Sequence, residues 1–469
     1  MEESLIQVVI VSIYMLLTIG IGIFSKSKVK SSRNFDGSGL GLLMCVVASA
    51  GEWLGGTSTT GVAEYGYEFG IAGAWYTIAN GVGVLVLAIF FARKFRSMNQ
   101  TTVPGMVGQS LGNRSRIVSS ALLLFAMVAV GISQMVAIAT LGETLFGLRP
   151  TLSILVMGLA VLLYTVFGGM LAVGYTNIMH VVILYGGSIL AVLACVNNIG
   201  GLSTLHASLP ESYFHMDSIG IPKVSSWLFA SVFGACVAQA GLQPILGARD
   251  EKTAERASYL IALLVAPFGL LTALLGMYAR VQFPGLESSK LALTTLIMSL
   301  NPAVGGLIMA ALLAAVLSTA SPIFLACGTL FTRDIYARLR SGAEYGEDAH
   351  TLRITRAATF AFGLLCIGGA LLFHDSQRLL DIVYFAYSIR GSLFIILLLG
   401  MYWRKTSSRA ANLAMLATSL VGLFWVAYKS AAGHYPIHPA FSETYAAMIT
   451  ALVFTVLGSF VWKKEKISA

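Results

Sequence analysis

The stretch "ASAGEWLGGTSTTG", residues 48–61, lies where hydropathy predicts a membrane-spanning helix. It carries the carboxylate Glu52 and four glycines, which are poor choices for a helix that crosses hydrocarbon. Backbone groups at membrane depth need hydrogen-bond partners, so an irregular stretch survives there only where it lines a cavity or is covered by protein. We therefore predict a span that is interrupted between Ser49 and Gly56.

The composition of the whole chain is that of a membrane protein. Of its 469 residues, 57% are hydrophobic and 11% are charged, whereas soluble proteins carry about 25% charged residues. Apolar runs of about 20 residues, long enough to cross a bilayer, recur along the chain. They predict an all-α polytopic membrane protein with about thirteen spans. The predicted spans are 5–25, 39–62, 71–92, 118–142, 150–168, 175–196, 225–246, 257–279, 302–331, 355–374, 379–402, 410–428 and 442–462.

The positive residues predict the orientation of these spans. With an outside N-terminus and a cytoplasmic C-terminus, the cytoplasmic segments hold 23 of the 30 lysines and arginines, and the outer segments hold six. The remaining one, Arg390, lies inside a span. This is the positive-inside bias. Loops that face an anionic leaflet also account for the net charge of +9, so no nucleic-acid partner is expected.

Several classes of protein are not supported by the sequence. No nucleotide-binding loop and no nucleophile–base pair is visible, so we expect neither an ATPase nor another enzyme. Transport against a gradient would then draw its energy from an ion gradient. The cysteines occur singly within predicted spans, which indicates packing residues rather than disulfides or a zinc site: Cys45, Cys195, Cys236, Cys327 and Cys366.

A second interrupted span is predicted in "SVFGACVAQAGLQPIL", residues 231–246, which contains Gly234, Gly241 and Pro244. The two interrupted spans are the second and the seventh, the spacing of an inverted repeat of five plus five helices in which opened helices hold solute and ion. Alternatively, these glycines only allow close helix packing. Polar residues beside the breaks favour opened helices: Glu52, Gln239 and Gln243.

The ninth span offers oxygen atoms that suit a small cation. Ala315, Ser318 and Thr319 lie within one helical turn and so on one face. Two hydroxyls and a nearby carbonyl are hard ligands. The alternative is that both hydroxyls bond only to their own helix backbone.

The sequence resembles the sodium/solute symporter family. The resemblance rests on "AALLAAVLSTASPIFLACGTLFTRDIYARL" (310–339) and "LYTVFGGMLAVGYTNIMHVVI" (163–183), and on two loop motifs, "TTVPGMV" (101–107) and "GLQPILGARDEKTAERA" (241–257). The stretch "GEWLGGTSTTGVAEYGYEFGIAGAW" (51–75) is similar to the choline- and urea-transporter branches. The similarity covers nearly the whole chain in the right order.

The resemblance implies a leucine-transporter-type fold and a sodium site. The chain would form one transporter domain, with a leading helix (5–25), two five-helix repeats (39–196 and 225–402) and two C-terminal helices (410–462). The sodium ligands that the family pattern implies are the backbone carbonyls of Cys45, Ala48 and Ala315 and the side-chain oxygens of Ser318 and Thr319.

Two departures from the family pattern narrow the function. Many members carry an aspartate where this chain has Asn177, and Pro322 offers no side-chain oxygen beside Ser321. We therefore expect one sodium site rather than two. Leu242 stands where the choline branch has a cage tryptophan, so choline is not the expected solute.

Two ionisable residues inside spans, Glu52 and Arg390, mark the expected solute site. Either they pair with each other and lock helix packing, or they meet a polar or zwitterionic solute, with the guanidinium taking a carboxylate. The predicted solute-binding residues are Ser49, Glu52, Trp53, Asn80, Gln134, Gln239 and Arg390.

The sequence thus predicts a sodium-coupled secondary active symporter in the cell membrane. It would import a small polar organic solute, zwitterionic or carboxylate-bearing and amino-acid-like. A proton-coupled symporter and a transporter-like membrane sensor are the alternatives. The expected partners are the solute, sodium and the lipid bilayer; no oligomeric state is indicated, and a monomer is compatible with the sequence.

Overall fold

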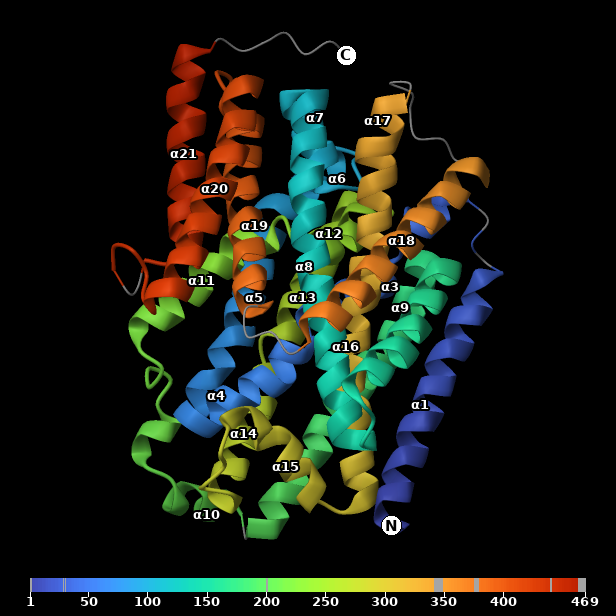
Figure 1. Ribbon diagram of the computed structural model, residues 1–469, viewed down its shortest axis with the longest axis vertical. Helices are drawn as coiled ribbons and strands as arrows, with labels where there is room; N and C mark the ends of the chain where they lie inside the picture. The colour runs from blue at the N-terminus through green and yellow to red at the C-terminus, as the bar shows by residue number, and fades with distance from the viewer. Residues whose placement is uncertain are drawn as a thin grey trace.

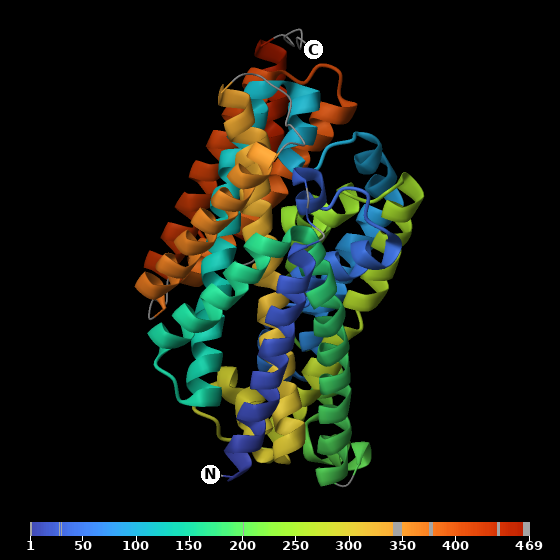
Figure 2. The same ribbon diagram turned by 90° about the vertical axis from the view of Figure 1, so that its right-hand side faces the viewer.

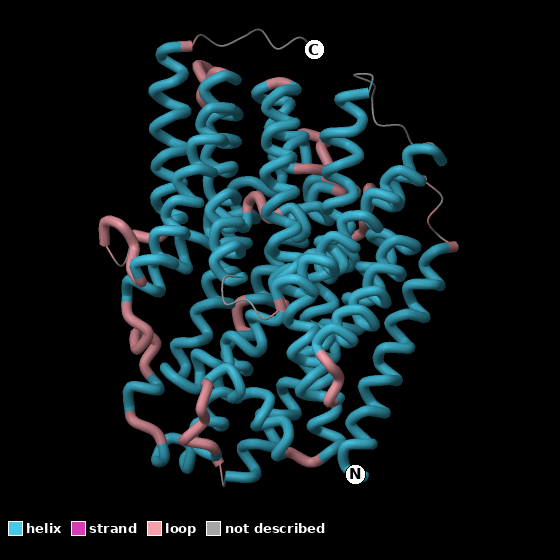
Figure 3. The backbone as a smooth tube through the Cα atoms, in the orientation of Figure 1, coloured by secondary structure: helices cyan, strands magenta, loops and turns pink. Residues whose placement is uncertain are grey.

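The computed structural model describes residues 2–27, 29, 31–199, 201–340, 349–374, 379–438 and 441–462. Within these ranges all regular structure is helical (Figure 3). The α-helices are α1 (Glu2–Lys26), α2 (Ser32–Asp36), α3 (Leu42–Trp53), α4 (Val62–Phe69), α5 (Trp75–Val86), α6 (Ala92–Ser97), α7 (Val103–Leu111), α8 (Asn113–Phe146), α9 (Pro150–Ile199), α10 (Leu202–Ser208), α11 (Ile221–Ala235), α12 (Gln239–Leu246), α13 (Glu251–Val265), α14 (Phe268–Gln282), α15 (Ala292–Ser299), α16 (Pro302–Leu330), α17 (Ala337–Arg340), α18 (Ala349–Phe373), α19 (Leu379–Tyr402), α20 (Ser408–Ala432) and α21 (Glu443–Val461). Three short segments are π-helical, η1 (Thr57–Gly61), η3 (Leu87–Phe91) and η6 (Phe331–Tyr336), and three are 3-10 helices, η2 (Gly70–Ala74), η4 (Glu211–Phe214) and η5 (Ser289–Leu291).

The helix α16 forms the core of the bundle (Figures 1 and 2). Every residue from Ile308 to Leu330 is buried, which matches a helix that is apolar on all sides. It packs against α1, α3, α8, α9 and α18. By contrast, α20 and α21 pack against each other at one edge of the bundle. The first interrupted span therefore meets a helix that the rest of the molecule holds in place.

Both predicted interruptions are present. The helix α3 ends at Trp53, and Leu54 has the non-helical angles φ −99° and ψ 43°. The break thus falls at the C-terminal end of the interval predicted from the sequence. In the second case α11 and α12 are separated by residues 236–238 and bent by 43°. That break lies between the two glycines that signalled it, Gly234 and Gly241.

Hydroxyl groups satisfy the backbone at the first break. The carbonyl of Gly55 accepts a hydrogen bond from Ser58 Oγ (2.7 Å). The carbonyl of Gly56 accepts from Thr59 Oγ1 and Thr60 Oγ1, each at 2.9 Å. The Gly55 carbonyl also accepts the Ser58 amide (3.1 Å). The run "TSTT" therefore adds side-chain bonds to the backbone at the start of the segment that follows the break.

The helices of the structure account for part of the predicted number of membrane spans. Among the described residues, nine helices are long and apolar enough to cross a membrane, or ten when α11 and α12 count as one bent span. The 50-residue helix α9 is kinked at Gly169 (φ 53°, ψ −149°), between two of the predicted spans. A total of thirteen stays a prediction. The start of α1 and the end of α21 lie at opposite ends of the bundle (Figure 1), as an odd number of spans requires.

The kink in α9 gives a first testable prediction. Gly169 has a positive φ, which costs other residues about 1–2 kcal/mol, and a Cβ there would lie 2.8 Å from the Phe35 carbonyl oxygen. Gly169→Ala should therefore lower the melting temperature of the purified protein by several degrees. Gly186→Ala is the matched control, because that glycine lies in the same helix with no atom near its missing Cβ. Equal melting temperatures for the two variants would contradict the kink.

Candidate functional site

The interrupted helix α3 and the core helix α16 bring a group of oxygen atoms together. Thr319 Oγ1 donates a hydrogen bond to the Gly51 carbonyl (2.7 Å) and lies 3.1 Å from the Ala315 carbonyl. Ser318 Oγ donates to the same Ala315 carbonyl (3.0 Å). Ala315, Ser318 and Thr319 are buried. Two carbonyls and two hydroxyls thus meet where the ninth-span pattern predicted a cation site.

Glycine is required on α3 for this approach. A Cβ on Gly51 would lie 2.5 Å from the Ser318 carbonyl oxygen, and a Cβ on Gly55 would lie 2.5 Å from Thr319 Oγ1. The next glycine is less confined, since a Cβ on Gly56 would lie 3.5 Å from a methyl group of Val316. Gly51 in α3 and Gly55 just after it therefore let this interrupted span reach the hydroxyls of α16.

Asn177 completes this region from α9. Its amide Nδ2 lies 3.1 Å from the Val47 carbonyl and 3.4 Å from the Ala48 carbonyl, and the residue is fully buried. An amide can donate to backbone carbonyls, whereas an ionised aspartate can only accept. Asn177 therefore gives the α3 carbonyls a neutral partner in a place where an aspartate would need a cation beside it.

These oxygens are hard ligands of the kind that sodium prefers, and the five sodium ligands expected from the sequence stay predictions. Thr319 donates to the Gly51 carbonyl, while the Cys45 side chain contacts the Leu40 and Pro244 carbonyls. Cys45 and Ala48 lie in the regular part of α3, because the break comes later than the centre of the predicted interval. Gly51 was missed by the sequence analysis, although its small size beside Glu52 was visible there.

Glu52 and Arg390 form a buried ion pair. Arg390 Nη2 lies 3.1 Å from Glu52 Oε1, and the two side chains are 4% and 6% exposed. The other carboxylate oxygen, Glu52 Oε2, is buried and has no hydrogen-bond partner within the described part of the chain. Arg390 Nη2 also contacts Met127 Sδ at 3.6 Å. The pair lies directly before the break in α3 and joins this helix to α19.

The remaining predicted solute residues divide into two groups. Trp53 and Gln134 lie beside glycines of the two interrupted spans. Trp53 Nε1 is 3.1 Å from the position that a Cβ on Gly241 would take, and Gln134 Oε1 is 4.0 Å from the position that a Cβ on Gly56 would take. Other predicted residues are engaged with the protein: Ser49 Oγ with the Gly241 carbonyl (2.5 Å), Asn80 Oδ1 with Ser231 Oγ (2.9 Å), and Gln239 Oε1 with the Val103 amide (2.8 Å). Their contact with solute stays a prediction.

Two further buried ion pairs were not predicted from the sequence. Asp36 at the end of α2 pairs with Arg333 at 2.9 Å, and Asp334 in η6 pairs with Arg116 of α8 at 2.6 Å. Both aspartates are fully buried. The sequence signal was "TRDIY", but its two charged residues reach partners roughly 220 and 300 positions away.

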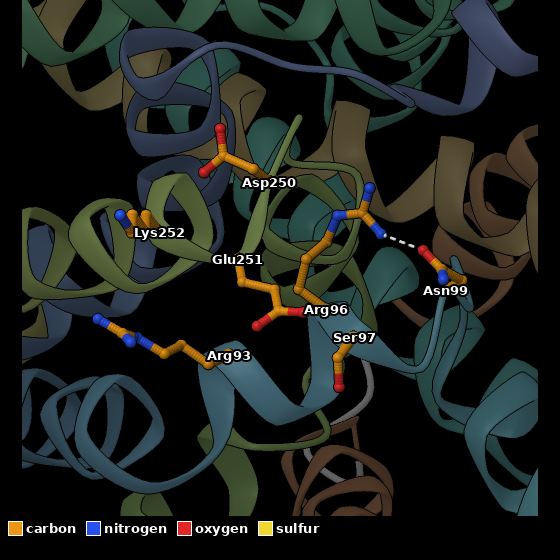
Figure 4. Close-up of a pocket in the computed structure, with 7 residues that line it drawn as sticks. All are labelled: Arg93, Arg96, Ser97, Asn99, Asp250, Glu251 and Lys252. Atoms are coloured by element: carbon orange, nitrogen blue, oxygen red, sulfur yellow. Dashed lines mark hydrogen bonds between the residues drawn. The ribbon is translucent and has the colours of Figure 1, made fainter.

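A surface cavity of about 420 Å³ lies elsewhere, between α6 and the start of α13 (Figure 4). Both of its arginines are engaged: Arg96 donates to the Ala248 carbonyl (2.5 Å) and to Asn99 Oδ1 (2.7 Å), and Arg93 pairs with Glu255 (2.5 Å). Asp250 accepts a hydrogen bond from the Thr253 amide (2.7 Å), which lowers its pKa. The cavity is thus a paired polar surface beside a helix cap. Its lining residues are Arg93, Arg96, Ser97, Asn99, Asp250, Glu251 and Lys252.

Comparison with known protein families identifies the family of this chain. The model of the sodium:solute symporter family matches residues 35–418. The chain belongs to the sodium:solute symporter family. This multi-pass membrane protein is thus a symporter with sodium as its coupling ion, and of the two coupling ions considered the family supports sodium. The family and the structural neighbours are transporters rather than enzymes.

Solved transporter structures share the fold of the symporter at low identity. A Na+-coupled sialic acid symporter in a substrate-bound, outward-open state has a TM-score of 0.84 at 16% identity, with 99% of each chain covered. The nucleobase-cation-symport-1 family transporter MHP1, closed with bromovinylhydantoin bound, has a TM-score of 0.62 at 14% identity over 91% of this chain and 93% of that one. MhsT in complex with L-phenylalanine has a TM-score of 0.56 at 14% identity over 89% and 98%.

The contact between α3 and α16 gives a second prediction. Gly55→Ala should strongly reduce sodium-dependent uptake by the symporter, because its methyl group would push Thr319 away from Gly51. Gly56→Ala should stay active, since its methyl group would meet Val316 at ordinary contact distance. Uptake into proteoliposomes and the sodium concentration for half-maximal rate measure both. Equal uptake by the two variants would mean that α3 and α16 do not form the ion site.

Proposed function

We propose that this symporter imports a small zwitterionic, amino-acid-like solute together with one sodium ion. The observation that carries the proposal is the buried Glu52–Arg390 pair directly before the break in α3. Sodium would bind between α3 and α16, with Ser318 and Thr319 as side-chain ligands. The solute would bind at the pair, within reach of Trp53.

The charge balance of the pair favours a zwitterion over a simple carboxylate. A solute that carries only a carboxylate could take Arg390 but would leave Glu52 charged and buried without a partner. Separating a buried pair in this way costs about 3–5 kcal/mol. A zwitterion offers a carboxylate to Arg390 and an ammonium group to Glu52, whose Oε2 lacks a donor within the described residues. Each buried charge then keeps a partner through the exchange.

Sequence and structure together favour one sodium ion per cycle. The Ser318 and Thr319 hydroxyls and the Ala315 carbonyl lie together, whereas Asn177 donates its amide to α3 where other family members carry an aspartate. Pro322 brings no side-chain oxygen to a second site. An outside N-terminus, a cytoplasmic C-terminus and the two five-helix repeats belong to the same proposal and rest on the charge bias and on the positions of the two breaks.

The stoichiometry gives a third prediction. Ser318→Ala and Thr319→Ala should each raise the sodium concentration for half-maximal uptake by roughly tenfold or more, because each removes a ligand oxygen. Ser321→Ala should leave it unchanged, because that hydroxyl would serve only the second site. Sodium titrations of uptake should give a Hill coefficient near one. A coefficient near two for the unaltered protein would sink the single-site proposal.

The ion pair gives a fourth prediction. Binding of a neutral amino acid should exceed that of the matched carboxylate and of the matched amine. Glu52→Gln and Arg390→Gln should each weaken zwitterion binding by about 100-fold or more and lower the melting temperature, because each leaves one buried charge unpaired. The double variant Glu52→Gln/Arg390→Gln should recover the melting temperature but not the binding.

The double variant separates the two roles of the pair. If the two groups only lock α3 to α19, removing both charges restores the packing and transport recovers with it. Recovery of transport in the double variant would therefore show that the pair is structural, and preferred binding of the amine or the carboxylate would exclude a zwitterion.

A further inference from the structure

A buried tyrosine of the leading helix α1 meets a buried histidine of α9. Tyr14 Oη lies 2.5 Å from His180 Nδ1, and the two residues are 3% and 0% exposed. The helices α1 and α9 pack along each other (Figures 1 and 2). A Cβ on Gly22 of α1 would collide with the side chain of Tyr164 in α9, so the two helices are in close contact at a second point as well. The position of α1 therefore holds the Tyr14 phenol against the His180 ring.

The hydrogen bond to Tyr14 decides which ring nitrogen of His180 carries the proton. A neutral imidazole accepts at one nitrogen and donates at the other, and a charged imidazole that faces a phenol would be costly at this depth. A phenol O–H is a stronger donor than an imidazole N–H, and an imidazole nitrogen is a stronger acceptor than a phenol oxygen. Tyr14 therefore donates to His180 Nδ1, and the ring proton lies on Nε2. This Nε2 is buried and has no hydrogen-bond partner within the described part of the chain.

Asn177 lies one turn before His180 on the same side of α9. Its Nδ2 contacts the Val47 and Ala48 carbonyls of α3 at 3.1 and 3.4 Å, and a Cβ on Gly51 would collide with this same nitrogen. The other amide atom, Asn177 Oδ1, is buried and has no hydrogen-bond partner in the described ranges. A donor at His180 and an acceptor at Asn177 thus both lack a partner within one turn of α9.

We propose that one buried water bridges His180 Nε2–H and Asn177 Oδ1, and that His180 is a positioning residue that fixes the orientation of the Asn177 amide. Buried waters join polar groups that have no other partner. The water accepts from His180 and donates to Asn177, so it holds Oδ1 on the side away from α3 and Nδ2 on the side toward it. Tyr14 acts one step earlier, because its phenol sets the tautomer of His180.

The orientation of the Asn177 amide matters for the ion site. The two ends of an amide are alike in shape and opposite in hydrogen-bonding character. If the amide turned over, Oδ1 would face the Val47 and Ala48 carbonyls, and repulsion between oxygens would replace two hydrogen bonds. The helix α1 thus acts on the carbonyls of α3 through the position of one proton. This effect on sodium rests on the proposed function, whereas the tautomer and the water do not.

Solid-state nitrogen-15 NMR of the full protein in lipid bilayers tests the tautomer and the water without sodium or solute. The chain has seven histidines, and the signals of His180 are assigned by their loss in His180→Gln. We expect a protonated Nε2, an unprotonated Nδ1 and magnetisation transfer from a bound water to Nε2–H. Tyr14→Phe should shift the Nδ1 signal, because it removes the phenol donor. A protonated Nδ1, no transfer from water, or an unmoved Nδ1 signal in Tyr14→Phe overturns the proposal.

The sodium dependence of the melting temperature tests the role of the amide orientation, with sodium alone as the probe. His180→Leu removes the donor and should raise the sodium concentration for half-maximal stabilisation about fivefold or more, whereas His180→Gln keeps an N–H donor and should stay within about twofold. Tyr14→Phe should act in the same direction as His180→Leu. Thr176→Val is the matched control and should leave the sodium response unchanged, because this buried hydroxyl beside Asn177 bonds to carbonyls of its own helix at 2.8 and 3.1 Å.

Ser318→Ala, measured in parallel, separates this inference from the proposed function. If sodium stabilises Ser318→Ala as it stabilises the unaltered protein, the proposed sodium site is wrong, and the NMR signals alone decide on the tautomer and the water. If Ser318→Ala is weakened while His180→Leu responds normally, or if His180→Leu and His180→Gln are weakened equally, His180 does not position Asn177. If His180→Leu does not fold, Tyr14→Phe takes its place, and a normal sodium response in that variant contradicts the proposal.

Discussion

The rest of the structure depends on how α3 is interrupted inside the membrane. A break frees the carbonyl groups in the last turn of α3, where water cannot reach them, and just after it the hydroxyls of Ser58, Thr59 and Thr60 bond to the Gly55 and Gly56 carbonyls. The same break leaves Gly51 able to meet Thr319 and places Glu52 opposite Arg390. The proposed ion site and the proposed solute site therefore depend on the same break.

The sequence predicted the architecture well because the relevant signals are local. Apolar runs, glycine clusters and the Ala315–Thr319 pattern each lie within one or two helical turns, and the structure confirms a helical bundle with both breaks. The positions that differ depend on distant parts of the chain. Nothing near Gln239 indicates that its amide would be used by the loop before α7, and nothing near Asp36 identifies Arg333, almost 300 residues away. The exact position of the break could not be predicted either, because sequence patterns place the ends of helices less reliably than their existence.

Three buried ion pairs within the described part of the chain have different requirements. The Arg116–Asp334 pair joins two continuous helices, so it can be permanent and its cost of desolvation is met once, on folding. The Asp36–Arg333 pair joins the end of α2 to η6; Arg333 is 18% exposed, and Asp36 is also held by Thr329. The Glu52–Arg390 pair is the most enclosed of the pairs that join interrupted to uninterrupted helices. In the proposed function, a solute that replaces both partners would separate this pair at low cost.

This last condition also sets the energy available for transport. A zwitterion carries no net charge, so a cycle with one sodium ion moves one positive charge across the membrane, and a membrane potential of 100 mV contributes about 2.3 kcal/mol to each cycle. A solute with a single negative charge would cancel the sodium charge and forfeit that contribution. In the proposed function, the Glu52–Arg390 pair and the neutral amide of Asn177 act in the same direction. The pair would select a solute without net charge, Asn177 would remove the need for a second cation, and sodium would then be the one charge that the potential drives inward.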